Sequence, residues 1–270
     1  MSVTMDQNQY EAVGSLIEET ITRLKKNMEL MPPSLRLLKD SIEKLKGSLS
    51  VLGEVSDWEP IGRYTLREDR AAYFKFIIDG LANNGWFIDF DMPLEVISEL
   101  NLLIKNRAFD KIDELLIEYF ERNLTTIKEF LLEQYPDRRK VLEAGFRAHA
   151  AKEYELSVLA FLSQVDGMFK EKLSVDFFEK RNKIPARAEC YRIYAVDELL
   201  QTFLYIFRKE YPIDYSEFKR PKGFTQLNRH MIMHGEAIDY GSRLNSLKAL
   251  SLVNHIADAL MSIDDEVESG

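Results

Sequence analysis

Residues 109–135 read FDKIDELLIEYFERNLTTIKEFLLEQY, and this stretch decides the fold class. Its apolar residues recur at steps of three and four, the spacing that places side chains on one face of a helix with 3.6 residues per turn. We therefore predict one long amphipathic helix. Its apolar face consists of Phe109, Ile112, Leu115, Leu116, Tyr119, Phe120, Leu124, Ile127, Phe130, Leu131 and Tyr135.

The sequence before this helix carries the same period in shorter segments. Pro32-Pro33 separates two of them, because a proline pair cannot continue a helix. Asn83-Asn84-Gly85 ends another, and we interpret the aromatic segment 86–92 as a loop. The predicted helices cover 6–30, 34–52, 67–83 and 92–106.

After the long helix, Pro136 and Asp137 begin a new one, since both residue types favour a first helical turn. Segments 154–169 and 191–207 are apolar nearly all round, which is typical of helices at the centre of a bundle. Between them, 177–189 is basic and contains a proline, so we interpret it as a connection.

The last clear periodic stretch is 244–261, which predicts another helix, and 264–270 is expected to be a solvated tail. The sequence therefore predicts an all-α protein. A helical N-terminal region of unknown role covers 1–135, and a C-terminal helical bundle covers 136–270. The boundary leaves open whether the two regions share one core.

Composition limits the class of protein. Of 270 residues, 46% are apolar and 30% charged, with no apolar run of eighteen, as in ordinary soluble proteins. The net charge of −9 argues against non-specific wrapping of nucleic acid, although it allows a local basic site. Cys190 stands alone, so no intramolecular disulfide can form, and we interpret it as a small buried thiol. With no secretory signal at the start, a cytoplasmic location is expected.

Common catalytic motifs are absent from the sequence: GxxxxGK[ST], GxGxxG, HExxH, paired CxxC and GxSxG. What stands out instead is LNRHMIMHG at 227–235. It holds Arg229, His230 and His234, and so two of the four histidines of the chain. These three are the candidate catalytic residues.

Three interpretations of this cluster remain open. His230 and His234 are four apart, so they share a helix face as metal-binding pairs do; a third ligand would have to be Glu236, Asp239 or His255. The cluster could instead be polar surface. Thirdly, it could handle phosphate, with arginine holding the phosphoryl oxygens and histidine moving a proton near neutral pH. For that role we expect solvent-lined side chains whose removal leaves the fold intact.

The spacing Arg229-x4-His234 resembles the R-x4-H motif of the HEPN superfamily, in which the arginine is commonly followed by Asn, Asp or His. The resemblance covers roughly the second half of the chain and is specific over 227–250. It implies a metal-independent endoribonuclease without a cofactor, in a toxin or antiviral defence setting. In those roles Arg229 stabilises the phosphate, His234 is the general acid–base and His230 orients either one.

The resemblance also implies a homodimer in which both motifs line one cleft. Such a dimer would supply the geometry that a single helix lacks, since positions five apart point about 140° apart. An inhibitory protein partner is a further implication. In one branch a tyrosine, two residues after the histidine, is modified by such a partner, and Glu236 stands in its place here. The alternative is a non-catalytic helical module that binds RNA, a nucleotide or a protein partner.

Other polar residues are weaker candidates. Gln164 and Asp166 lie in an apolar helix, where polar groups need partners, and we single out Asp166 as a possible support for the catalytic side chains. Asn245 either has the same role or caps the last helix. The expected RNA-binding residues are Lys219, Arg220 and Lys222, and a second basic patch comprises Lys180, Arg181, Lys183 and Arg187.

Overall fold

The structure is a computed structural model that describes residues 62–196 and 198–269. The predicted helices 6–30 and 34–52 lie outside these residues. Residues 61–270 form one compact unit, so the predicted boundary at 135/136 falls inside it.

The described residues are mostly helical, which confirms the all-α prediction. The long predicted helix is α5, and α3 ends at Ala82, just before the Asn-Asn-Gly sequence. The α-helices are α3 (Gly62–Ala82), α4 (Leu94–Lys105), α5 (Phe109–Gln134), α6 (Arg139–Ala150), α7 (Tyr154–Leu173), α8 (Arg187–Tyr194), α9 (Glu198–Phe203), α10 (Arg229–Met233) and α11 (Arg243–Ser269).

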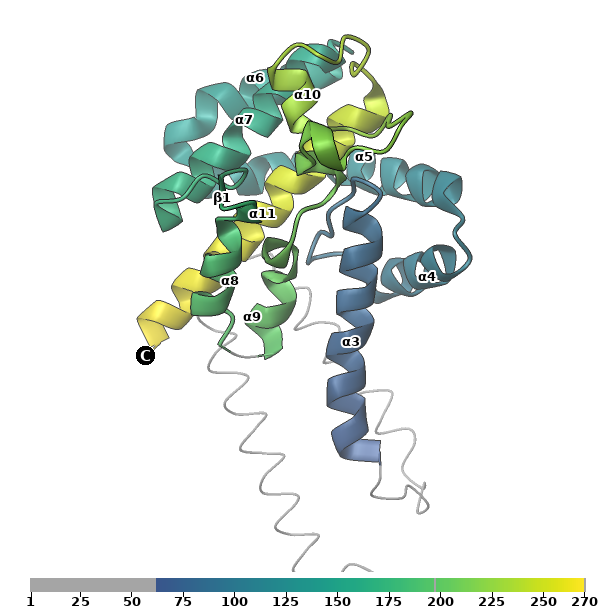
Figure 1. Cartoon of the computed structure of the whole chain (residues 1–270), viewed down its shortest axis with the longest axis vertical. Coiled ribbons are helices and arrows are strands. Elements are labelled where there is room, and N and C mark those ends of the chain that lie inside the picture. Colours follow the sequence, from purple (N-terminus) through teal and green to yellow (C-terminus); the bar gives the residue numbers. More distant parts are fainter. Residues whose placement is uncertain (1–61, 197, 270) are drawn as a thin grey trace, which may run out of the picture. The chain divides into compact units, whose positions relative to one another are not determined.

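Helix α11 is the centre of this unit and contacts α7, α5 and α9 (Figure 1). The apolar side chains of α11 are buried. Small residues let α7 approach closely, and the hydroxyls of Ser157 and Ser246 are hydrogen-bonded at 2.7 Å. His149 of α6 reaches the same Ser246 hydroxyl at 2.7 Å. The apolar character of 154–169 therefore reflects burial inside the chain, as predicted for a central helix.

The predicted loop 86–92 is confirmed, and much of it is buried. Trp86 stacks on Phe120 of α5, and its indole N–H donates to Asp113 at 2.7 Å. The buried His255 of α11 meets the carbonyl of Ile88 at 2.9 Å. Because the Phe87 N–H and the Ile88 carbonyl hydrogen-bond to side chains of α11, an irregular segment can be buried here.

The prediction of one helix over 191–207 is wrong. Helix α8 ends at Tyr194, a separate α9 follows, and a 3-10 turn covers Tyr205–Arg208. Apolar residues are not all inward there, since Ile193 and Val196 are more than half exposed. Periodicity alone does not reveal this interruption, because apolar residues continue through it.

The predicted connection 177–189 contains a small antiparallel hairpin of β1 (Lys180–Arg181) and β2 (Ile184–Pro185), and it ends in the first turn of α8. At the C-terminus, the expected tail instead continues α11 as helix to Ser269.

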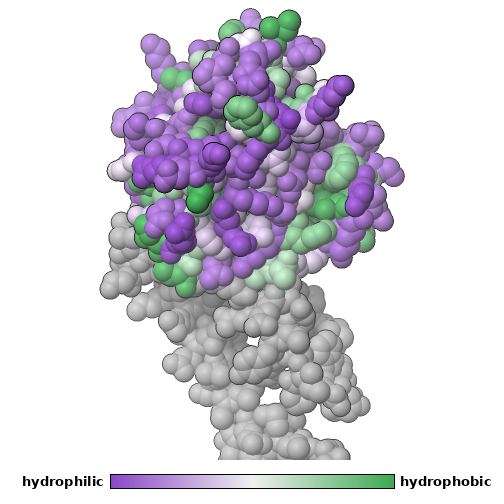
Figure 2. Space-filling view, in the orientation of Figure 1, coloured by the Kyte–Doolittle hydropathy of each residue, from purple (hydrophilic) through white to green (hydrophobic). Residues whose placement is uncertain are grey.

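In the described part of the chain no helix is long and apolar enough to cross a membrane. The face shown in Figure 2 is mostly hydrophilic, with hydrophobic residues in small separate groups.

Candidate functional site

The candidate motif lies on α10, a short helix held at its N-terminus by Asn228. The Asn228 side chain is buried and its oxygen accepts from the Met231 N–H at 3.0 Å, as an N-cap does. Its amide donates to the carbonyls of Pro212 and Tyr215 at 2.7 and 3.0 Å. One side chain therefore fixes both the start of α10 and the neighbouring 3-10 turn Pro212–Asp214.

The C-terminal end of α10 is equally well defined. His234 is the C-cap, and Gly235 follows with φ of +72°, a conformation that favours glycine. The Gly235 N–H donates to Ile232 and the Glu236 N–H to Met231, at 3.1 and 2.8 Å. These are the two bonds of a Schellman motif. They confirm the expected place of His234 at a helix end and turn Glu236 back toward the helix.

Arg229 points toward α7. Its Nη2 donates to Asp166 Oδ2 at 3.1 Å, and its guanidinium lies 5.2 Å from the ring centre of Phe178. Asp166 also accepts the Phe178 N–H at 3.0 Å. Burial raises the pKa of Asp166, and the Phe178 N–H and Arg229 offset only part of this. Asp166 is thus the predicted candidate that the structure places beside the motif.

The expectation of a solvent-lined Arg229 is wrong, because only 30% of its side chain is exposed and it forms part of a paired, packed unit. Replacing it would leave the partly buried Asp166 carboxylate without its cation.

The two histidines lie against one another, with ring centres 4.4 Å apart. Glu236 Oε1 is 3.6 Å from His230 Nδ1, and Glu236 Oε2 accepts from Arg220 Nη1 at 2.6 Å. The bond from Arg220, with the charges of Arg220 and both histidines, holds the pKa of Glu236 below its usual range. The loop residue Arg220 is therefore part of the α10 cluster.

Arg229 and His234 are not brought together within one chain. Arg229 turns to α7, whereas His234 is exposed and its ring lies against His230. The expected divergence of positions five apart is thus present.

Several of the predicted RNA-binding residues are engaged in ion pairs. Lys219 and Lys180 both bind the buried Glu210, each at 2.8 Å. Arg181 pairs with Glu179 at 2.8 Å, while Lys222 and Lys183 are exposed.

The interpretation of Arg187 as part of a phosphate-binding patch is wrong. Its side chain is fully buried and pairs with Asp214 at 2.6 Å. It also donates to the carbonyls of Phe177 and Lys209. Sequence position alone could not separate this structural arginine from its exposed neighbours.

The metal interpretation finds no ligand set: among residues 62–196 and 198–269, no three His, Cys, Asp or Glu side chains are grouped to hold an ion. The proposed third ligand His255 is buried beside Ile88, and burial lowers its pKa to about 4. Glu236 is occupied by Arg220.

Asn245 is not the cap of α11. The hydroxyl of Ser242 accepts from the Asn245 N–H at 3.1 Å, and the Asn245 amide holds the carbonyl of Tyr240 at 2.9 Å. Asn245 therefore supports the segment between the motif and α11.

Gln164 accepts a hydrogen bond from Arg138 at 3.0 Å in a structural network. Cys190 is a buried thiol whose pKa is raised by burial.

Sequence reasoning missed the anchor of the site, Asn228. The signal was available, because an asparagine directly before a short helix is a typical N-cap. The link from Arg220 to Glu236 had no such signal, since it joins two loops sixteen residues apart.

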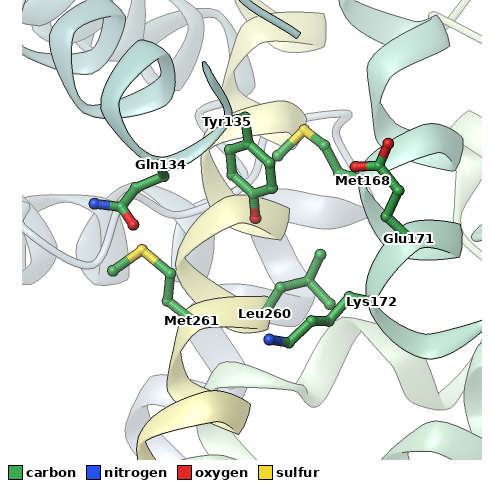
Figure 3. A pocket seen from close by; sticks show the side chains of 7 residues that line it. All are labelled: Gln134, Tyr135, Met168, Glu171, Lys172, Leu260 and Met261. Atoms are coloured by element: carbon green, nitrogen blue, oxygen red, sulfur yellow. The ribbon is translucent and has the colours of Figure 1, made fainter. Parts of the chain in front are cut away.

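A separate pocket of about 240 Å³ lies between the end of α5, α7 and α11 (Figure 3). Its lining residues are Gln134, Tyr135, Met168, Glu171, Lys172, Leu260 and Met261. None of the candidate residues lines this pocket.

No protein family, curated protein or solved structure matches this chain. The chemistry of the α10 site must therefore carry the functional argument.

Proposed function

We propose that the protein is a metal-independent endoribonuclease of HEPN type, with Arg229 and His234 as its catalytic residues and no cofactor. The supporting pattern is the resemblance of Arg229-x4-His234 to the family motif. The arrangement around α10 adds a second, independent line of support.

The observation that carries the proposal is a group of polar atoms without partners. Among the described residues, six buried side-chain nitrogens or oxygens have no hydrogen-bond partner, and three belong to this cluster: Nε of Arg220, Nε of Arg229 and Nδ1 of His230. A buried polar group without a partner is unfavourable. Arg220 and His230 flank the Glu236 carboxylate and Arg229 pairs with Asp166, so all three side chains already face an anionic group, which favours a phosphate as their ligand.

The reaction follows from these groups. His234 takes the proton of an RNA 2′-hydroxyl, and the 2′-oxygen forms a bond to the adjacent phosphorus. Arg229 binds the non-bridging oxygens as negative charge builds on them. The bond from phosphorus to the 5′-oxygen breaks, and the 5′-oxygen takes a proton from the protonated His234. The products are a 2′,3′-cyclic phosphate and a 5′-hydroxyl, and His230 orients His234.

The divergence of Arg229 and His234 supports a homodimer, in which the histidine of one copy meets the arginine of the other. Exposed apolar side chains on the flanks of α10 supply contact area: Phe218, Met233 and Ile238 are 97%, 39% and 88% exposed. The apolar residues of α7 do not serve this purpose, because they are largely buried inside the chain.

The cellular setting that we propose is a cytoplasmic toxin or defence system, with an inhibitory protein partner that covers the α10 surface. Control by modification of a tyrosine two residues after His234 is excluded, because Glu236 is there.

Total RNA incubated with the purified chain in EDTA tests the proposal. We expect cleavage by the parent, products ending in 2′,3′-cyclic phosphate, and loss of cleavage in Arg229→Ala and His234→Ala. Retention of RNA without cleavage would instead support the alternative, a helical binding module. The ion pairs of Lys180, Lys219 and Arg220 do not favour the binding module over the enzyme. They reduce the positive charge that is free to bind RNA in either case.

A further inference from the structure

We propose that Arg220 and His230 form a phosphate subsite next to the catalytic residues, and that Glu236 occupies it until an RNA phosphate displaces the carboxylate. The inference deepens the proposed function and rests on it. It assigns a positioning role to Arg220 and a masking role to Glu236.

The first observation is the state of Arg220. Only 9% of its side chain is exposed, although it lies in a loop, and its buried Nε has no partner. Its Nη1 is bound to Glu236 alone among the described contacts. A guanidinium carries its donors in a planar fork that fits two oxygens of a phosphate. Arg220 therefore presents a guanidinium with five N–H donors, of which Nη1 is held by a replaceable carboxylate.

The second observation is the position of Glu236. Its carboxylate lies between Arg220 at 2.6 Å and His230 at 3.6 Å. The distance to His230 is too long for a hydrogen bond, and the His230 Nδ1 is unpartnered. A carboxylate thus lies between Arg220 and the His230 ring, but it satisfies their nitrogens incompletely. The low pKa of Glu236 agrees with a carboxylate that stays ionised there.

The third observation is that the Glu236 side chain is exposed while its backbone is fixed. The backbone of Glu236 is fixed by its bond to Met231, whereas its side chain is 41% exposed. It can rotate into solvent without breaking α10. Arg220, in contrast, is packed and stays in place. Only the Glu236 half of this ion pair is solvent-exposed, so the carboxylate can leave and a phosphodiester, whose single negative charge is shared by two oxygens, can take its place on Arg220.

The test uses NMR of the histidine ring C–H groups, because the chain has four histidines and each gives a separate signal. The full chain is titrated first with inorganic phosphate and then with a 2′-O-methyl hexanucleotide, which lacks the reacting hydroxyl. Both probes should shift His230 and His234, and leave the buried His149 and His255 unchanged.

Two variants give the expected direction. Glu236→Gln should bind both probes about 3- to 10-fold more tightly, because the competing charge is gone. Arg220→Met should bind both at least about 10-fold more weakly. Glu118→Gln is the matched control, since Glu118 is an exposed carboxylate paired with Arg122, and it should behave as the parent.

Equal affinities in Glu236→Gln and the parent would overturn the masking role. Shifts with inorganic phosphate but not with the oligonucleotide would overturn the assignment to RNA. The readout needs no cleavage: a parent chain that binds as described but cuts no RNA would remove the proposed endoribonuclease and leave the subsite standing.

Discussion

The pair between Arg229 and Asp166 makes an asymmetric prediction about stability. Arg229→Met keeps the apolar stem beside Phe178 but removes the cation from a partly buried carboxylate. A hydrogen bond to a charged group contributes about 1.5–3 kcal/mol. Because 30% of the Arg229 side chain is exposed, solvent screening reduces this to about 1–2 kcal/mol. At roughly 2–4 °C per kcal/mol for a unit of this size, Tm should fall by about 2–8 °C.

Asp166→Asn should behave differently. The amide oxygen of asparagine still accepts the Phe178 N–H, and the substitution removes a charge that burial disfavours. In the parent, the pKa of Asp166 is higher in the folded state than in the unfolded state. Folding therefore favours the neutral carboxyl, and the ionised carboxylate lowers stability above the folded pKa. We therefore expect Tm to change by less than about 2 °C at pH 7. RNA cleavage should nevertheless fall about 10-fold or more, because Arg229 loses its orienting partner.

Thermal melts of both single variants, the double variant and the parent form a double-mutant cycle. The double variant should melt closer to the parent than Arg229→Met does, since no unpaired charge remains. Arg122→Met is the matched control, because it breaks the exposed pair with Glu118 and should leave Tm unchanged. If Asp166→Asn lowers Tm as much as Arg229→Met and the two effects add, the pair is not coupled as the contacts indicate.

Two further predictions concern the support of the site, and a third concerns the buried carboxyl groups around Asp258. Asn228→Ala removes the cap of α10 and the side-chain donor to the carbonyls of Pro212 and Tyr215; we expect a loss of about 2–4 kcal/mol in urea unfolding, and a loss below about 0.5 kcal/mol would contradict the anchoring role. Gly235→Ala should destabilise by about 1 kcal/mol through its positive φ alone, because nothing lies within 4 Å of the added Cβ; chemical denaturation checks this, and a neutral effect would argue against the Schellman turn. Burial raises the pKa of Asp89, Asp91 and Asp258, and the charge of Asp89 adds to this for Asp91, whose pKa rises to about 7, and for Asp258. Because the folded pKa values lie above the unfolded ones, the stability contributed by the neutral carboxyls is complete below about pH 4 and is lost as pH rises through each folded pKa, which is about 7 for Asp91. Asp258→Asn should therefore gain stability over the parent at pH 8.5 relative to pH 5, and a pH-independent difference would refute this.

The helical fold was largely predictable from sequence because amphipathic periodicity is a local signal. Apolar and polar residues of α5 follow one another at helical spacing, so the bounds of this helix are predicted to within one residue. Segment 191–207 lacked that contrast. A run that is apolar on every side carries no information on where the backbone turns, and the break after Tyr194 was missed.

The residues of the candidate motif could be picked out from the sequence, but most of the contacts that hold them could not. Asp166 could be suspected because a polar residue in an apolar helix needs a partner, and Arg229 is that partner. The burial and the ion pairs of Arg187 and Arg220 had no local signal. Whether an arginine in a basic loop is buried, exposed or folded onto another loop depends on residues distant in sequence, here Asp214 and Glu236.

Cleavage of RNA in the presence of EDTA, by the parent chain and by Arg229→Ala, His234→Ala and an equimolar mixture of the two variants, tests the central claim most directly. The account predicts that the parent cleaves and that each variant alone does not. The mixture should recover part of the activity, because a mixed dimer pairs the intact arginine of one copy with the intact histidine of the other. Cleavage at the parental rate by both single variants would contradict the assignment of Arg229 and His234 as catalytic residues.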